Sequence, residues 1–350
     1  MTGNDQKPLL ALVDGSNYLY RAYYAIPSLT NSKGFPTNAI YGFASMFIRL
    51  LGEIEPDYVV VAFDLKGPTT RHEEFADYKA TRKPMPDDLA VQLPSIKEMI
   101  RAFSVSIVEK QGIEADDLIG TLTVGANEKG WRTAIISGDK DLMQLVGDTV
   151  TMVDTMKDKT YDAAAVKEKF GVGPDKVVEI LGLMGDASDN IPGVPGVGPK
   201  TAQRLIEEYG TVEAVIEHAQ SLRNVKLRES FRQYADQARL SRRLALIRTD
   251  IDIDFDLTTA RRREPDGERL AGLFGEFEFS SLMRQFKADS DKPAGICEVV
   301  DSAEAVAVVA AKLTDAQKFA CEIIHEKTPV QEMIGIAIGT DDRAFYIPLA

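Results

Sequence analysis

Three short apolar runs, each followed by an aspartate, constrain most strongly what this chain can fold into. The runs cover residues 9–13, 58–63 and 133–136, and the acids that follow them are Asp14, Asp64 and Asp139. Short runs rich in β-branched residues and separated by helical stretches are typical of buried strands in a parallel sheet. Ligands of such sheets bind beyond the carboxyl ends of the strands. We therefore expect the three aspartates to meet at one edge of an α/β sheet.

Two further acidic segments are candidates for the same edge. Residues 114–119 open a predicted helix, and residues 185–190 follow an apolar helix. Together with the strand-end acids they give nine carboxylates, namely Asp14, Asp64, Glu114, Asp116, Asp117, Asp139, Asp141, Asp186 and Asp189. So many anions in one pocket repel each other unless cations bind between them, and oxygen ligands without His or Cys favour Mg²⁺ or Mn²⁺. The alternative for each single acid is a helix cap or a turn former.

Composition excludes several classes of protein. The two cysteines, Cys297 and Cys321, and the three histidines, His72, His218 and His325, lie too far apart in the sequence for a zinc site. The first eight residues contain no apolar stretch for a signal peptide. Together with the low cysteine content, this predicts a reducing cytoplasm. No run approaches the roughly 18 apolar residues of a membrane-spanning helix, so a membrane role is not expected.

The net charge of −13 argues at first against a polyanionic partner. The charge is unevenly distributed, however, because residues 221–243 hold seven Lys or Arg against Glu229 and Asp236. A net-acidic protein can bind nucleic acid if part of its acidity holds metal ions.

Residues 66–84 combine cations with aromatic side chains. Placed on a helix, Arg71, Phe75, Lys79 and Arg82 share one face. Such a face suits a single nucleic-acid strand, with cations on phosphates and rings on bases. The alternative is a solvated surface helix with a packed Phe75.

Residues 191–202 are rich in glycine and lead into a predicted helix at 203–209. Glycines at this density permit backbone amides to approach a phosphate, while the helix N-terminus and Lys200 add positive charge. The segment is not a Walker loop or a dinucleotide fingerprint, because Gly-x-Gly-x-x-Gly is absent and no strand precedes it. A bare turn between two helices is the alternative.

Several motifs, in order over residues 8–288, resemble the 5′ nuclease domain of bacterial DNA polymerase I. They are Val-Asp-Gly-Ser at 13–16, Tyr-Lys-Ala-Thr-Arg at 78–82, Glu-Ala-Asp-Asp at 114–117, Gly-Asp-Lys-Asp at 138–141, Gly-Asp-Ala-Ser-Asp-Asn-Ile-Pro-Gly at 185–193 and a helix-hairpin-helix at 193–201. The resemblance implies a PIN-like parallel sheet with a helical arch, followed by a helical region that contains the hairpin. It also implies Mg²⁺-dependent cleavage of 5′ flaps and nicked duplex DNA by a cytoplasmic, monomeric protein, with RNA-primed DNA among its substrates.

The resemblance assigns roles to individual residues. It makes the nine acids the metal-binding set and places Lys79 and Arg82 in the arch as catalytic residues. The expected DNA-binding residues are Arg71, Phe75, Tyr78, Gly193, Gly196, Gly198, Lys200 and Thr201. A K⁺ ion held by carbonyls of the hairpin is also implied.

Residues 289–295 have the composition of a linker, and a new pattern follows. Strands are expected at 296–300, 318–324, 333–339 and 344–348, and a helix at 302–313. This part resembles the start of the RNase H-like proofreading exonuclease domain of the same polymerase. The first metal motif of that domain appears here as Cys-Glu-Ile-Ile at 321–324. Glu322 stands at the aspartate position, but Ile324 replaces the second carboxylate, so we expect no 3′→5′ exonuclease activity.

The sequence thus predicts four parts: a catalytic domain (1–165), a helix-hairpin-helix region (166–288), a linker (289–295) and the start of a degenerate exonuclease-like domain (296–350) of a longer protein. The predicted chemistry is two-metal hydrolysis of a phosphodiester. The expected ligands of the tighter ion are Asp14, Asp64, Glu114, Asp116 and Asp117, and those of the looser ion are Asp139, Asp141, Asp186 and Asp189. Two alternatives are a stand-alone exonuclease or RNase H of the same superfamily, and a DNA-binding module that has lost catalysis.

Overall fold

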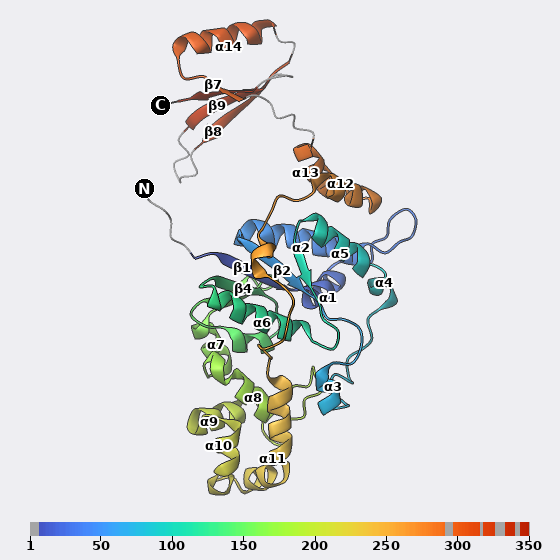
Figure 1. Cartoon of the computed structure of the whole chain (residues 1–350), viewed down its shortest axis with the longest axis vertical. Coiled ribbons are helices and arrows are strands. Elements are labelled where there is room, and N and C mark those ends of the chain that lie inside the picture. The colour runs from blue at the N-terminus through green and yellow to red at the C-terminus, as the bar shows by residue number, and fades with distance from the viewer. Residues whose placement is uncertain (1–6, 291–296, 316–317, 326–332, 340–343, 350) are drawn as a thin grey trace. The chain divides into compact units, whose positions relative to one another are not determined.

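The computed structural model describes residues 7–290, 297–315, 318–325, 333–339 and 344–349. They belong to two compact units, Met1–Ser280 and Ser281–Ala350, and each is described by itself. Figure 1 labels the helices and strands of both units. In the described part of the chain, no helix is long and apolar enough to cross a membrane.

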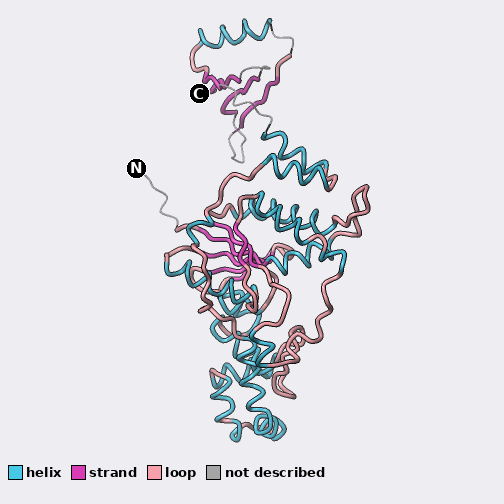
Figure 2. Tube along the Cα trace, turned by 45° about the vertical axis from the view of Figure 1, so that its right-hand side comes forward, coloured by secondary structure: helices cyan, strands magenta, loops and turns pink. Residues whose placement is uncertain are grey.

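The first unit is built around a six-stranded sheet with the order β3-β2-β1-β4-β5-β6, drawn in magenta in Figure 2. Its strands pair in parallel except β6, which is antiparallel to β5. Their bounds are β1 Leu9–Asp14, β2 Tyr58–Ala62, β3 Ser106–Val108, β4 Arg132–Ile136, β5 Val150–Asp154 and β6 Lys159–Tyr161. The central strand pairs Leu12 with Val60 of β2 and with Ile135 of β4. This register confirms the predicted parallel sheet and brings the carboxyl ends of β1, β2 and β4 to one edge.

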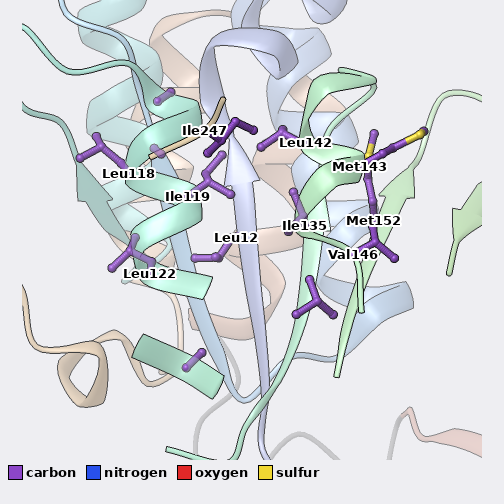
Figure 3. Packing of buried hydrophobic residues seen from close by; sticks show 14 of the residues in the cluster. Leu12, Leu118, Ile119, Leu122, Ile135, Leu142, Met143, Val146, Met152 and Ile247 are labelled. Atoms are coloured by element: carbon purple, nitrogen blue, oxygen red, sulfur yellow. The ribbon is translucent and has the colours of Figure 1, made fainter. Parts of the chain in front are cut away.

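Helices cover the sheet and bury its apolar side chains. They are α1 Gly15–Ala25, α2 Asn38–Ile54, α4 Asp87–Ala90, α5 Leu93–Ala102, α6 Ala115–Glu128 and the short 3₁₀ helix η1 Asp141–Leu145. Apolar residues of α6 pack against those of the strands, as Figure 3 shows for Leu118, Ile119 and Leu122 around Leu12. The first turn of α6 contains two acids, Asp116 and Asp117.

A helical region follows β6. It consists of α7 Ala163–Phe170, η2 Pro174–Lys176, α8 Val177–Met184, α9 Pro199–Tyr209, α10 Val212–Glu217, η3 Ala219–Ser221 and α11 Val225–Ala245. Its apolar residues form a second core, and α8 contributes to both cores. The predicted domain boundary between residues 165 and 166 falls inside α7.

After α11 the chain returns to the sheet. Ile247, Ile251 and Leu257 add to the first core, and Arg261 forms a bridge with Tyr58 of β2. The 3₁₀ helix η4 (Leu257–Ala260) and α12 (Gly267–Glu276) lie in this stretch.

The 66–84 segment departs from the sequence prediction of a helix with one functional face. Only α3, Thr70–Glu74, is helical, and it ends at Phe75, whose backbone is extended. Lys79 has a φ of 56°, in the left-handed region that no α-helix contains. The cause is tertiary, because the Lys79 N–H donates to the Asp189 carbonyl at 2.9 Å instead of to a helical partner.

The second unit contains α13 (Ser280–Ser290), whose first residue belongs to the first unit, and an α/β part. That part consists of β7 Cys297–Val299, α14 Ala303–Asp315, β8 Ala320–His325, β9 Met333–Gly339 and β10 Ala344–Pro348, with strand order β7-β10-β9-β8. These elements agree with the predicted strands and helix. Most of the predicted linker, residues 291–295, lies outside the described residues.

Candidate active site

Two strand-end acids, Asp14 and Asp64, stand beside each other at the carboxyl edge of the sheet. Asp14 ends β1 and caps α1, since its Oδ1 accepts from the Asn17 N–H at 2.9 Å. Asp64 lies two residues beyond β2, and its Oδ1 accepts from the Ala115 N–H at 2.9 Å. The capping alternative is thus true of Asp14, and its second oxygen, Oδ2, still faces the edge, where it accepts from the Ser137 hydroxyl at 2.8 Å.

The loop after β4 carries Asp139 and Asp141. The Asp139 N–H donates to the Ser137 hydroxyl oxygen at 3.0 Å, and the Asp141 N–H donates to Asp139 Oδ1 at 3.0 Å. Ser137 therefore connects this loop to Asp14. Among the described residues, the buried Oδ1 atom of Asp141 has no hydrogen-bond partner, and the Lys140 ammonium lies 3.9 Å away.

Three acids of the site, Asp14, Asp141 and Asp116, resist ionisation in the folded protein. Burial, reinforced by the charges of Asp64 and Asp139, raises the pKa of Asp14 to about 7. Burial and the charge of Asp139 raise the pKa of Asp141 to about 8. Burial, Asp139 and Asp14 likewise raise the pKa of Asp116 well above its usual range. The mutual effects show that the strand-end acids and Asp116 share one electrostatic environment.

Glu114 is different, because cations surround it. Its Oε2 accepts from Lys79 Nζ at 2.9 Å, from the Tyr78 hydroxyl at 3.0 Å and from Arg71 Nη1 at 3.3 Å. Burial alone would raise the pKa of Glu114, but Lys79 and Arg71 lower it below its usual range.

Asp186 and Asp189 come from the loop after α8 and are also paired. Lys140 Nζ contacts Asp186 Oδ2 at 2.5 Å, and this contact lowers the pKa of Asp186 against the opposing effect of burial. Asp189 Oδ1 accepts from Arg82, and its Oδ2 accepts from the Tyr78 hydroxyl at 3.2 Å. Tyr78 therefore links Glu114, at the first turn of α6, to Asp189 in the loop after α8.

Two DNA-binding candidates, Arg71 and Tyr78, and one metal-ligand candidate, Asp117, are buried in the structure. Arg71 is 6% exposed and pairs with both oxygens of Asp117, at 2.7 and 2.8 Å. Asp117 is fully buried, and its Oδ1 also accepts from the Arg248 N–H at 2.9 Å. Tyr78 is 3% exposed, with its hydroxyl bonded to carboxylates. The chain itself thus supplies the partners of all three side chains, and their predicted roles in DNA and metal binding stay predictions. Phe75 is partly buried against the first core, as the packing alternative expected.

The hairpin between α8 and α9 has a buried and an exposed part. Gly193 is buried, with its N–H donating to Ser241 Oγ at 3.0 Å and its carbonyl accepting from Gln237 Nε2 at 2.6 Å. A Cβ on Gly193 would overlap the backbone of residues 184 and 185, so only glycine fits there. Gly193 therefore anchors the hairpin through its own N–H and carbonyl, and its predicted contact with DNA stays a prediction. The exposed part contains Gly196, Gly198 and Lys200, while Thr201 is half-buried. The predicted K⁺ ion stays a prediction.

Ser137 and Lys140 contact candidate metal ligands, Asp14 and Asp186, but the sequence analysis did not predict them as site residues. Ser137 directly follows β4, and Lys140 lies inside the Gly-Asp-Lys-Asp motif, so their positions next to the acids were the available signal.

The donor set fits a hard divalent cation. It contains carboxylate oxygens without His or Cys, and the unpartnered Asp141 oxygen and the raised pKa values indicate anions that lack compensating charge. Within the described ranges, no three of the His, Cys, Asp and Glu side chains are grouped closely enough to hold one ion. Lys79, Arg82 and Lys140 contact Glu114, Asp189 and Asp186 instead.

Comparison with known proteins now defines the family. Residues 9–171 match the model of the 5'-3' exonuclease N-terminal resolvase-like domain, and residues 172–268 match the 5'-3' exonuclease C-terminal SAM fold. A 5'-3' exonuclease of Aquifex aeolicus is 40% identical over 276 residues, which cover 79% of this chain and 94% of that protein. This chain belongs to the 5'-3' exonuclease family. The predicted resemblance and the predicted fold class are thereby confirmed.

Longer relatives match almost the whole chain. DNA polymerase I of Bacillus caldotenax is 39% identical over 345 residues, 97% of this chain and 39% of that protein. DNA polymerase I of Pseudomonas aeruginosa is 38% identical over 369 aligned residues, and 40% of its length is covered. The chain therefore spans about two fifths of these polymerases.

Solved structures share the fold. A T5 5'-exonuclease with bound zinc is 21% identical and has a TM-score of 0.59, covering 80% of this chain and 97% of that one. The catalytic core of Rad2 in complex with DNA substrate is 17% identical, with a TM-score of 0.55 over 81% of this chain and 93% of that one. At these identities the likeness concerns the fold alone.

Proposed function

We propose that this chain is a Mg²⁺-dependent 5′ nuclease that hydrolyses phosphodiester bonds at 5′ flaps and nicks in duplex DNA, including RNA-primed DNA. The observation that carries the proposal is the set of carboxylates at the sheet edge, where three acids have raised pKa values and cationic side chains contact their neighbours. Family membership sets the direction of attack, at 5′ ends.

Eight acids are assigned to two divalent ions. Asp14, Asp64, Glu114 and Asp116 would hold the tighter ion, and Asp139, Asp141, Asp186 and Asp189 the looser one. Asp117 is omitted because it is fully buried and the Arg71 guanidinium binds both of its oxygens. When bound, Mg²⁺, or Mn²⁺ in its place, supplies a water of lowered pKa and stabilises the leaving 3′ oxygen.

Lys79 and Arg82 act on the phosphate. Lys79 Nζ lies 2.9 Å from Glu114 and 3.6 Å from Asp189, so its ammonium stands between these two carboxylates. Arg82 is half exposed beside Asp189 and can turn toward an incoming strand. Once other cations neutralise these carboxylates, both side chains are available to stabilise charge on the scissile phosphate.

The hairpin holds duplex DNA away from the cleavage point. The N-terminus of α9 begins at Pro199, directly after the exposed Gly198 and before the exposed Lys200. Exposed backbone amides, the helix dipole and the Lys200 ammonium together suit a backbone phosphate. Gln237 and Ser241 of α11 fix the hairpin through Gly193.

A labelled flap substrate tests the proposal. A duplex with a 5′-labelled single-stranded flap is incubated with the protein in Mg²⁺ or in EDTA. We expect release of the flap in Mg²⁺ only. Absence of metal-dependent release would contradict the enzymatic proposal and favour the DNA-binding module. A blunt duplex and an RNA–DNA hybrid in parallel reactions test the alternative of a stand-alone exonuclease or RNase H, which would cleave them at least as fast as the flap.

A further inference from the structure

Arg71 and Asp117 form a buried charged pair that the proposed chemistry leaves without a role. The Arg71 guanidinium has five N–H donors, and all five are used. Nη1 and Nη2 bind Asp117 at 2.7 and 2.8 Å, and Nη1 also contacts Glu114 Oε2 at 3.3 Å. Nε donates to the Leu244 carbonyl at 2.9 Å, and Nη2 donates to the Leu246 carbonyl at 2.7 Å.

The pair joins three segments that are distant in the sequence. Arg71 belongs to α3 in the 66–84 segment, Asp117 to the first turn of α6, and the two carbonyls to the C-terminal end of α11. The Arg248 N–H adds a second bond from the α11 side to Asp117, at 2.9 Å. A buried Arg–carboxylate pair with bidentate geometry is directional, so it fixes the orientation of these segments as well as their separation.

Each segment carries part of the candidate active site. The 66–84 segment holds Lys79, the first turn of α6 follows Glu114, and α11 holds the hairpin through Ser241. With only the five-residue α3 as regular structure, the 66–84 segment depends on such tertiary bonds for its conformation.

We propose that Arg71 and Asp117 are a positioning pair, which fixes Glu114 and Lys79 relative to each other and to the end of α11. This inference rests on the proposed nuclease function and deepens it. It predicts that losing the pair slows cleavage without removing a metal ligand or a DNA contact.

The experiment compares Asp117→Asn and Arg71→Gln with a matched control, Glu179→Gln. Glu179 is also a buried carboxylate, and it accepts from Arg242 Nε at 2.7 Å and from the Val212 N–H at 2.8 Å. It lies on α8 and is not one of the acids assigned to the metal ions. All variants are assayed at a temperature where urea titration shows them fully folded.

Four quantities are measured: the single-turnover rate on the flap, the Kd for the flap in EDTA, the number of Mn²⁺ ions bound in calorimetry without DNA, and amide hydrogen exchange. For both pair variants we expect a rate about 10- to 100-fold lower, as for residues that orient metal ligands. The Kd and the number of bound ions should stay within error of the wild type. The Glu179→Gln protein should keep the wild-type rate even if its unfolding free energy falls by as much as that of the pair variants.

Three outcomes would overturn the proposal. Rates that fall with stability in the control as they do in the pair variants would show a merely structural role. The loss of one Mn²⁺ ion from Asp117→Asn alone would make Asp117 a metal ligand. A several-fold weaker Kd for Arg71→Gln would restore a DNA contact.

Hydrogen exchange separates this proposal from the proposed function. In Arg71→Gln, amides of residues 66–84 and 244–248 should exchange faster, while in Glu179→Gln they should not. This readout needs no catalysis, so it remains decisive if the wild-type protein proves inactive on flaps. Unchanged exchange in both segments would contradict the positioning role.

Discussion

The acids of the pocket fall into two groups that the fold treats in opposite ways. Asp14, Asp116 and Asp141 are crowded against other carboxylates, and their pKa values are raised. Glu114 and Asp186 contact cations of the chain itself, and their pKa values are lowered. Glu114 and Asp186 are therefore stabilised without a metal ion. The first three acids destabilise the metal-free fold, and we infer that they are kept for a ligand that the chain does not provide.

The largest expected effect is on activity when an acid of the crowded group is lost. Asp116→Ala should lower flap cleavage by on the order of 10³-fold or more, because it removes a metal ligand. The metal-free protein should be as stable as the wild type or more so, because repulsion is relieved. Asp186→Ala is the counterpart from the paired group. It should slow cleavage less and should destabilise the fold, since Lys140 loses its partner. Flap assays and urea titrations in EDTA measure both effects, and equal stability changes in the two variants would break the distinction between the groups.

The next effect concerns Lys79, the lysine that pairs with Glu114. Lys79→Ala should slow the single-turnover rate, because an ammonium that acts on the phosphate stabilises the transition state by about 2–4 kcal/mol. Binding of the flap in EDTA should change little. The pKa of Glu114 should rise toward its usual range, since Lys79 is the main cation that lowers it. Single-turnover kinetics at saturating enzyme measure the rate. A wild-type rate in Lys79→Ala would assign Lys79 to charge pairing alone.

A smaller effect is the pH dependence of stability. The pKa values of Asp14 and Asp141 are raised to about 7 and about 8, so the folded protein binds these protons more tightly than the unfolded chain. The resulting stabilisation is complete below the unfolded pKa and is lost as the pH rises through about 7 to 8. In EDTA, the melting temperature should therefore be higher at pH 6 than at pH 8.5, by on the order of 5 °C.

The paired group sharpens this test. The lowered pKa values of Glu114 and Asp186 stabilise the fold above the usual carboxyl range, and that stabilisation is lost only in acid. They do not contribute between pH 6 and 8.5. Thermal melts of the wild type and of Asp14→Asn with Asp141→Asn decide the matter, because the double variant should lose the part of the pH difference that these two acids contribute, while Asp116 keeps its own part. A wild-type melting temperature that does not change with pH would show that the pKa values of the crowded acids are not raised.

The smallest expected effect lies outside the pocket. Lys200→Ala should weaken flap binding a few-fold and reduce the salt dependence of binding by about one phosphate contact. The single-turnover rate at saturation should be unchanged. Lys129→Ala, an exposed lysine at the C-terminal end of α6, is the control. Binding measured over a salt series tests this, and an equal slope for both variants would remove Lys200 from the duplex contact.

The sequence predicted those parts of the site that depend on strand ends. Asp14 and Asp64 follow short apolar runs separated by a helical stretch, which is the pattern typical of buried parallel strands, so their meeting could be foreseen from the pattern. The orientation of side chains in the 66–84 segment could not. Helical periodicity placed Arg71 and Lys79 on one exposed face, but Arg71 finds Asp117, 46 residues away, and the Lys79 backbone bonds to Asp189. Such long-range bonds leave no local signal, and they overrode the helical pattern.

The return of the chain to the sheet after α11 has a consequence for the order of folding. Ile247, Ile251 and Leu257 complete the first core, yet they follow β1 by more than two hundred residues of sequence. During synthesis on the ribosome, β1 through β6 therefore emerge long before the residues that close their hydrophobic side. The helical region must form as a loop between two halves of one core, and contacts of such high sequence separation slow folding. Until residue 257 has emerged, the nascent sheet exposes apolar surface that a chaperone can bind.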